Sequence, residues 1–279
     1  MAGNSMKDIK NRIRSMESTR QITKAMEMVA ASKLRTAQEK AVASKPYLDI
    51  LHDTVKNLAT AQPEETSVFF QEREGGKTLC VVIAGDRGLA GGYNSAVLKM
   101  AQEAMDGKES VFLPMGKKAV EFFGSRGIVE KDYAVAEDVQ VGSCFSLAKN
   151  LTKEFLKGTY NEIVLCYTEF QSVLSQTPKA LRLLPLRDVE HEKTRKKSPL
   201  YEPDGNTVLH AIVPEYLGGL IYASLCQCRA SEQAARRSAM DAATQNADEM
   251  IEDLSLKFNR ARQGAITREI TEIVAGAES

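Results

Sequence analysis

The hydrophobic positions divide the chain into two terminal stretches with helical spacing and a middle part with strand spacing. From Glu215 to Ser279 there is no proline and there are only four glycines, so little would interrupt a helix. Apolar residues recur there at steps of four and three residues, namely Ala247, Ile251, Leu254, Phe258, Ala261 and Ala265. This is the spacing of a coiled-coil seam. We therefore predict a long C-terminal helix that pairs with another helix.

The N-terminal stretch supplies the partner helix. Its apolar residues repeat at the same steps, and it has no glycine between Gly3 and Gly75. We predict one helix from near Ser5 to near Leu58, with a kink at Pro46, whose ring clashes with the preceding turn. Alanines stand in its middle part where a core helix would carry leucines, and small residues let a partner helix approach closely.

The middle of the chain alternates between strand-like and helix-like segments. Short apolar runs that suit strands are Thr78–Ala84, Ser110–Leu113, Tyr133–Ala136, Glu162–Tyr167 and Leu181–Leu186. Helix-like stretches occur near Ser95–Met105, Lys117–Ser125 and Ser143–Lys157. The alternation predicts an α/β fold with a mainly parallel, Rossmann-like sheet that carries helices on both faces. The expected domains are an N-terminal coiled-coil helix (residues 1–61), a globular α/β domain (62–205) and a C-terminal coiled-coil helix (206–279).

The two long helices flank a domain whose ends should lie close together, which makes their pairing antiparallel. The second helix is expected to begin between Asn206 and Glu215, because Pro214 can start a helix but disturbs its interior. It is the longer of the two, so its last turns should outrun the partner. Apolar residues would then lack cover within the chain, around Ile266, Ile270, Ile273 and Val274. Exposed apolar surface usually marks a binding surface, so we expect another protein to surround this end.

Composition limits the classes of function. The formal net charge is zero, which argues against charge-driven binding to nucleic acid or membranes. Eight basic residues nevertheless lie between Lys7 and Arg35 against three acidic ones, which makes this helix either a basic rod or an ordinary solvated face. No apolar run is long enough to span a membrane, and the start has no signal core or presequence, so we expect a cytoplasmic protein. Five cysteines without a CxxC pair predict neither disulfides nor a metal site.

A glycine-rich loop, Gly85–Gly92, follows a predicted strand and precedes a predicted helix, as in dinucleotide-binding folds. Its glycines are spaced GxxGxxGG and not GxGxxG, so a structural turn is the favoured interpretation. No catalytic motif is present, and we predict no active site and no cofactor. Two alternative functions stay open at this point: a nucleotide-binding α/β protein with coiled-coil arms, and a passive coiled-coil scaffold.

Five segments in order along the chain carry a family resemblance. They are Gln21–Arg35 (QITKAMEMVAASKLR), Asp86–Gly92 (DRGLAGG), Leu200–Asp204 (LYEPD), Ser231–Arg236 (SEQAAR) and Ala261–Val274 (ARQGAITREITEIV). With them the chain resembles the gamma subunit of the F-type ATP synthase, in its bacterial form, over essentially its whole length. Ala90 replaces the usual cysteine of the second segment, and no chemistry depends on that thiol.

The resemblance implies a central rotor without an active site of its own. Its coiled coil would fill the cavity of a hexamer of three alpha and three beta subunits, and its globular domain would meet the epsilon subunit and the c-ring. Rotation would couple hydrogen ion transport to ATP synthesis or hydrolysis on beta. The protein would then be peripheral, on the cytoplasmic face of the bacterial inner membrane, and would reach the membrane only through the complex.

The same resemblance implies contact residues. Lys24, Met26 and Lys33 match the part of the shaft that meets an acidic loop of beta. Glu232 and Arg236 match positions that couple the C-terminal helix to this region. The upper hexamer would be met by Arg262, Gln263, Thr267 and Glu269, and the foot that faces the c-ring and epsilon would hold Tyr201 and Glu202. The plainer alternatives are a packing role for Met26 and an ordinary i, i+4 ion pair for Glu232 and Arg236.

Overall fold

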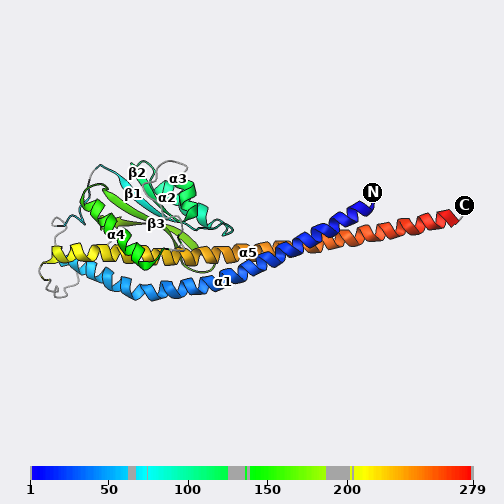
Figure 1. The fold of residues 1–279 in the computed structure, drawn as a ribbon, viewed down its shortest axis with the longest axis horizontal. Helices are drawn as coiled ribbons and strands as arrows, with labels where there is room; N and C mark the ends of the chain where they lie inside the picture. Colours follow the sequence, from blue (N-terminus) through cyan, green and yellow to red (C-terminus); the bar gives the residue numbers. More distant parts are fainter. Residues whose placement is uncertain are drawn as a thin grey trace. The chain divides into compact units, whose positions relative to one another are not determined.

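The computed structural model describes residues 2–61, 67–73, 75–124, 136, 139–186, 202 and 204–277, apart from the side chains of residues 2–5, 59–61 and 277. The chain forms two compact units. The first consists of residues 1–31 together with 236–279, and the second consists of residues 32–235. Two long helices, α1 (Ala2–Ala61) and α5 (Gly205–Ala277), contribute residues to both units (Figure 1).

The ends of the two long helices agree closely with the sequence pattern. Helix α1 continues through Pro46, and α5 continues through Pro214. Helix α5 begins at Gly205, one residue before the predicted range, because Asp204 caps its first turn. Its Oδ1 accepts from the backbone N–H of Thr207 at 2.9 Å, and its Oδ2 accepts from the hydroxyl of Thr207 at 2.7 Å. The domain limits drawn at residues 61 and 205 stay a prediction.

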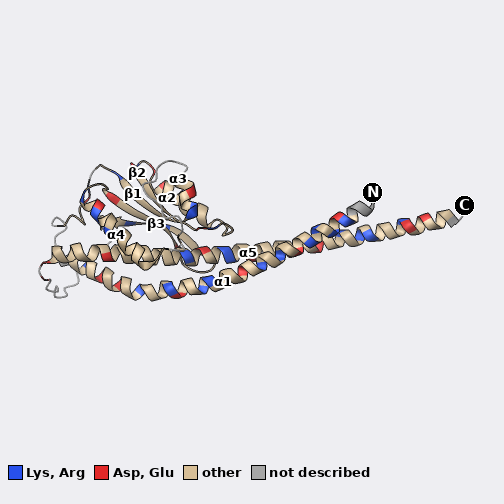
Figure 2. Ribbon diagram, in the orientation of Figure 1, with Lys and Arg blue, Asp and Glu red and all other residues tan. Residues whose placement is uncertain are grey.

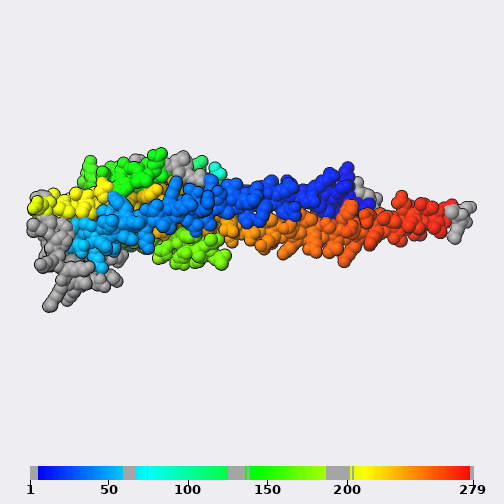
Figure 3. Space-filling model, turned by 90° about the horizontal axis from the view of Figure 1, so that it is seen from below, coloured from blue at the N-terminus to red at the C-terminus, as the bar shows by residue number. Residues whose placement is uncertain are grey.

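In the first unit α1 and α5 pair in antiparallel directions. The hydroxyls of Thr23 and Thr244 are 2.8 Å apart and buried, and Arg20 Nη1 lies 3.1 Å from Asp248 Oδ1. Rising numbers on α1 therefore meet falling numbers on α5. Helix α5 extends past the start of α1 (Figures 1 and 3), and its apolar side chains there are exposed, Ile266 by 48%, Ile270 by 57%, Ile273 by 67% and Val274 by 53%. The predicted uncovered end is confirmed.

The second unit contains a four-stranded sheet with the strand order β2-β1-β3-β4. Its strands are β1 (Thr78–Ile83), β2 (Ser110–Met115), β3 (Glu162–Phe170) and β4 (Gln176–Leu184). The first three are parallel, and β4 is antiparallel to β3. The prediction of a mainly parallel sheet is confirmed, with an antiparallel strand at one edge.

Helices cover both faces of this sheet, as predicted. Alternate residues of β1 point to opposite faces. Cys80 and Val82 pack against α2 (Tyr93–Ala104) and α3 (Lys117–Gly124), whereas Leu79 and Val81 pack in a larger core with α4 (Val141–Leu156) and with parts of α1 and α5. The long helices are therefore one layer of this unit and not appendages to it.

Two predicted strands differ from the structure. The last one, Leu181–Leu186, begins earlier, at Gln176, and forms a hairpin with β3. Its first half is polar and contains Pro178, which an edge strand tolerates because one side of its backbone is unpaired. Of the segment Tyr133–Ala136, residues 133–135 lie outside the described residues, and Ala136 is not in a strand.

Glu162, at the start of β3, is the centre of an ion-pair cluster at the amino end of this inner strand. Its Oε2 lies 2.6 Å from Lys108 Nζ, and its Oε1 lies 3.0 Å from Arg182 Nε. Burial alone would raise the pKa of this carboxyl. The hydrogen bond from Lys108, the charges of Lys108 and Arg182 and a bond from Thr78 outweigh it, so the pKa lies below the ordinary value of 4.5.

We expect Glu162→Gln to destabilise the second unit by about 1 kcal/mol at pH 7. A carboxyl whose pKa is lowered by folding stabilises the folded chain above its unfolded pKa, and this stabilisation is lost as the pH falls below 4.5 towards the folded value. The difference between wild type and variant, measured by urea unfolding, should therefore shrink on acidification. Glu109→Gln is the matched control, because Glu109 is 70% exposed and lies 3.9 Å from Lys77. Equal effects of the two changes would contradict the role of the cluster.

All five cysteines are free and buried. Cys80 and Cys166, on neighbouring strands, have their sulfurs 3.4 Å apart. Against the expectation that no stretch of the chain could span a membrane, α5 contains an 18-residue window that is apolar and long enough to cross one, and 56% of that window is buried within the protein. The core helix of a protein that does not enter membranes meets the same criterion, so length and composition decide nothing here.

Candidate functional site

The surface of α1 around Met26 combines apolar and basic side chains. Met26 is half-buried, whereas Ile22 and Val29, one turn before and after it on the same face, are exposed by 58% and 57%. Met28, exposed by 60%, lies on another face of the helix. Figure 2 shows Lys and Arg spaced along the N-terminal part of this helix. The two exposed apolar neighbours of Met26 were not predicted as contact residues, although both lie in the matched segment Gln21–Arg35. A contiguous exposed apolar face such as the one formed by Ile22, Met26 and Val29 is typical of a surface that binds another protein.

Lys24 is held in its charged form beside this surface. Its Nζ lies 2.8 Å from Glu27 Oε2, and the hydrogen bond to Glu27 raises the pKa of Lys24. The Lys24 side chain is 53% exposed, so it remains accessible to an acidic partner. An exposed ion pair of this kind contributes little to stability and can be exchanged readily.

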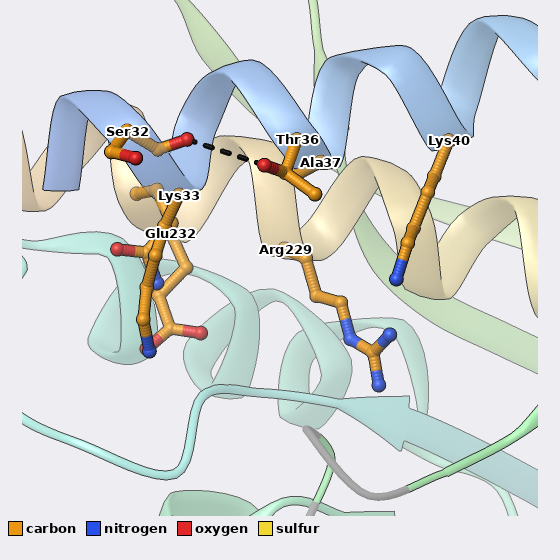
Figure 4. A pocket seen from close by; sticks show the side chains of 8 residues that line it. Ser32, Lys33, Thr36, Ala37, Lys40, Arg229 and Glu232 are labelled. Atoms are coloured by element: carbon orange, nitrogen blue, oxygen red, sulfur yellow. Dashed lines mark hydrogen bonds between the residues drawn. The ribbon is translucent and has the colours of Figure 1, made fainter. Parts of the chain in front are cut away.

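Lys33 and Glu232, which the sequence analysis named separately, lie together in the second unit. Both line a pocket of about 410 Å³ between α1 and α5. Figure 4 shows the two side chains reaching in the same direction, with Arg229 and Lys40 along the same pocket. Arg229 and Lys40 were not predicted as site residues, although helical spacing places Lys40 on the face of Lys33 and Arg229 on the face of Glu232. Three basic groups and one carboxylate give the pocket a positive balance.

The loop after β1 is closed by side chains of the protein itself. The backbone N–H of Gly85 donates to Asn94 Oδ1 at 2.8 Å, and Asp86 Oδ1 accepts from the backbone N–H groups of Lys117 at 3.0 Å and Ala136 at 2.9 Å. A Cβ atom on Gly85 would lie 2.8 Å from Glu232 Cδ. A carboxylate therefore occupies the approach that a pyrophosphate would need, and like charges repel. This geometry favours the structural turn over a nucleotide site.

The remaining predicted contact residues are spread along α5 and beyond it. Arg236 is buried. Arg262, Gln263, Thr267 and Glu269 are exposed on the last part of the helix, where the hydroxyl of Thr267 donates to the carbonyl of Gln263 at 3.0 Å. Glu202 is exposed, and Tyr201 lies outside the described residues. Within the described part of the chain no group of three His, Cys, Asp or Glu side chains is placed to hold a metal ion.

The family model described as ATP synthase matches residues 5–279 of the chain. A relative from Ruminococcus albus named ATP synthase gamma chain is 43% identical over 275 residues, which is 96% of each chain. One of the same name from Moorella thermoacetica is 42% identical over 98% of each chain.

The fold is similar to that of solved rotary complexes. A chain of the Euglena gracilis mitochondrial ATP synthase rotor aligns with a TM-score of 0.69 at 18% identity, over 95% of this chain and 99% of that one. A chain of the same synthase, solved as OSCP, F1 and c-ring in another rotational state, aligns with a TM-score of 0.71 at 19% identity, over 99% and 94%. The fold, the five segments and the relatives agree, and the chain belongs to the family of ATP synthase gamma chains.

Proposed function

We propose that this chain is the central rotor subunit of an ATP synthase and couples rotation of a proton-driven c-ring to ATP synthesis or hydrolysis on beta subunits. The observation that carries the proposal is the antiparallel helix pair whose longer member, α5, ends in exposed isoleucines and a valine. Such an end requires cover, and a ring of alpha and beta subunits around the helix pair supplies it. The protein then has no active site of its own and needs no cofactor.

The coupling mechanism follows from the asymmetry of the helix pair. A partner shifts a conformational equilibrium only by binding its states unequally. Three identical beta subunits around two unlike helices each meet a different face, and the differences move round the ring as the pair turns. Lys24, Met26 and Lys33 on α1 are the proposed contacts with beta, and exposed charge contacts of about 0.2–1 kcal/mol each would form and break readily. Glu232 and Arg236 on α5 are buried, so in this proposal they position the helix from within the chain and do not touch beta themselves.

Two further contact regions belong to the proposal. Arg262, Gln263, Thr267 and Glu269 would meet the upper part of the hexamer, and their exposure supports this role. Tyr201 and Glu202 would face the c-ring and the epsilon subunit. The complex would be attached to the cytoplasmic face of the bacterial inner membrane, with this chain as a peripheral component and with no binding to nucleic acid.

Reconstitution tests the proposal. The purified chain is mixed with alpha and beta subunits of a bacterial relative, and size-exclusion chromatography and ATP hydrolysis are measured together. A complex with one copy of the chain per six partner subunits and a large gain in hydrolysis is the expected result. A chain that elutes alone and binds ATP or NAD by itself would support the nucleotide-binding alternative. A chain that only forms dimers with itself would support the scaffold.

A further inference from the structure

One turn of α5 makes polar contacts with several elements of the α/β part of the second unit. We call residues 228–232 the polar collar. Ala230 faces α1, where it packs in a small cluster with Leu34 and Ala37. The other four residues of the turn contact the α/β part of the same unit through a side chain or a backbone group. All of them except Arg229 are less than 9% exposed.

Two collar residues complete the unpaired edge of β3. The strand β1 pairs with β3 only as far as Cys166, so the backbone of Thr168 has no strand neighbour on that side. Helix α5 replaces it. The N–H of Thr168 donates to Cys228 Sγ at 3.2 Å, and its carbonyl accepts from Ser231 Oγ at 3.3 Å. Both side chains stand three residues apart on the helix, which places them on one face.

The rest of the collar reaches three other elements. The hydroxyl of Tyr93, at the start of α2, donates to the carbonyl of Cys228 at 3.1 Å, and this bond is buried. Arg229 Nη2 donates to the carbonyls of Ala136 at 2.6 Å and Val139 at 3.3 Å. The carboxylate of Glu232 lies against Gly85 in the loop after β1. One helical turn is thus fixed from several directions.

These contacts differ in kind from the apolar packing between α5 and the sheet. Apolar contact is non-directional and tolerates a small rotation of a helix about its own axis. A hydrogen bond weakens steeply when its angle or distance changes. A set of bonds from different directions on one turn therefore opposes rotation and axial sliding of α5 against the sheet more sharply than packing alone.

We propose that the polar collar fixes the rotational angle of α5 relative to the α/β domain. Torque applied to the domain is then transmitted to the helix with little twisting between the two. The proposal rests on the rotor function proposed above. Tyr93 and Ser231 act as positioning residues, since they set the angle of the helix and touch no partner subunit.

The test uses the assembled complex with its hexamer fixed to a surface and a bead attached to the α/β domain at the exposed Lys99, changed to cysteine. With no ATP present, the width of the angular fluctuations of the bead reports torsional stiffness. The double variant Tyr93→Phe with Ser231→Ala should widen the angular variance about two-fold, because two of the bonds that set the angle are gone. ATP hydrolysis without load should stay near the wild-type rate, and ATP-driven proton pumping in membrane vesicles should fall.

Two controls separate this role from plain stabilisation. Ser224→Ala removes a buried hydroxyl on the same helix, about 10 Å before Ser231, and should leave the variance unchanged. Ser231→Thr keeps the hydroxyl and should restore the stiffness. Wild-type variance in the double variant, or an equal rise with Ser224→Ala, would overturn the proposal. If the double variant does not assemble, Tyr93→Phe alone decides the question by the same readout. Failure of the wild-type chain to assemble would instead refute the rotor function.

Discussion

Replacing Gly116 by alanine is expected to destabilise the second unit by about 4 kcal/mol, enough to unfold a marginal domain. Gly116 stands between β2 and α3 with a φ of +96°, a backbone conformation that L-residues rarely adopt. An added Cβ would also lie far inside van der Waals contact with the carbonyl oxygen of Ala84. That oxygen belongs to the backbone at the end of β1, so it cannot move aside as a flexible side chain would.

Gly107→Ala is the matched control for this change. Gly107 also has a positive φ, +71°, but no atom lies within 4 Å of the position of its added Cβ. It should therefore lose only the conformational part, about 1 kcal/mol. Hydrogen exchange of the amides in β1 and β2 measures both losses in stability. Gly107 precedes β2, Gly116 follows it, and β1 pairs with β2. If Gly116→Ala costs no more than Gly107→Ala, the close approach to Ala84 does not constrain the chain.

Replacing Met26 by lysine is expected to uncouple rotation from catalysis, with ATP-driven proton pumping and ATP synthesis reduced about ten-fold while hydrolysis is retained. Met26 is half-buried among exposed apolar residues of α1, in the proposed contact with an acidic loop of beta. An ammonium there adds a charge-assisted contact that must break in every turn, and about 1.4 kcal/mol of extra binding in one orientation corresponds to a ten-fold change.

Met28→Lys provides the comparison, because Met28 is 60% exposed and lies about 200° round the helix from Met26. It adds the same charge to the same segment on another face. Pumping, synthesis and hydrolysis are measured in membrane vesicles that contain the assembled synthase. Normal pumping and synthesis in the Met26 variant would refute the proposed contact, and equal losses in both variants would show that added charge alone is responsible.

Much of this architecture could be predicted because helical and strand spacings leave different marks on a sequence. The coiled-coil spacing from Ala247 onwards was sufficient to predict the helix α5. The apolar run that begins at Thr78 was sufficient to predict the strand β1. The hairpin strand β4 was located only in its second half, because the residues around Pro178 alternate little and lie at an edge that water can reach. The start of α5 was predicted within Asn206–Glu215 because of Pro214. The helix begins at Gly205 because the carboxylate of Asp204 caps its first turn.

The site was predictable only in part, for a different physical reason. Lys33 and Glu232 were named from local motifs, but their common pocket depends on how two helices that are far apart in sequence pack together. The same holds for the polar collar, in which Cys228 and Ser231 bond the backbone of Thr168. Every residue has the same backbone N–H and carbonyl, so the sequence does not show which of these groups lack a partner in a neighbouring strand. The sequence therefore could not predict that side chains of a helix bond to Thr168.

The first unit joins residues 1–31 to residues 236–279, and this division has a consequence for biosynthesis. The N-terminal helix leaves the ribosome first, yet the residues that pair with Thr23 and Arg20 are made after residues 32–235. At about 5–20 residues per second that interval is roughly ten to forty seconds. An isolated helix is marginal in water, so during this time Ile22, Met28 and Val29 belong to an unpaired segment that chaperones would recognise. A chain whose translation stops early therefore never forms the paired helices, and only chains translated beyond Asp248 can enter the complex with them intact.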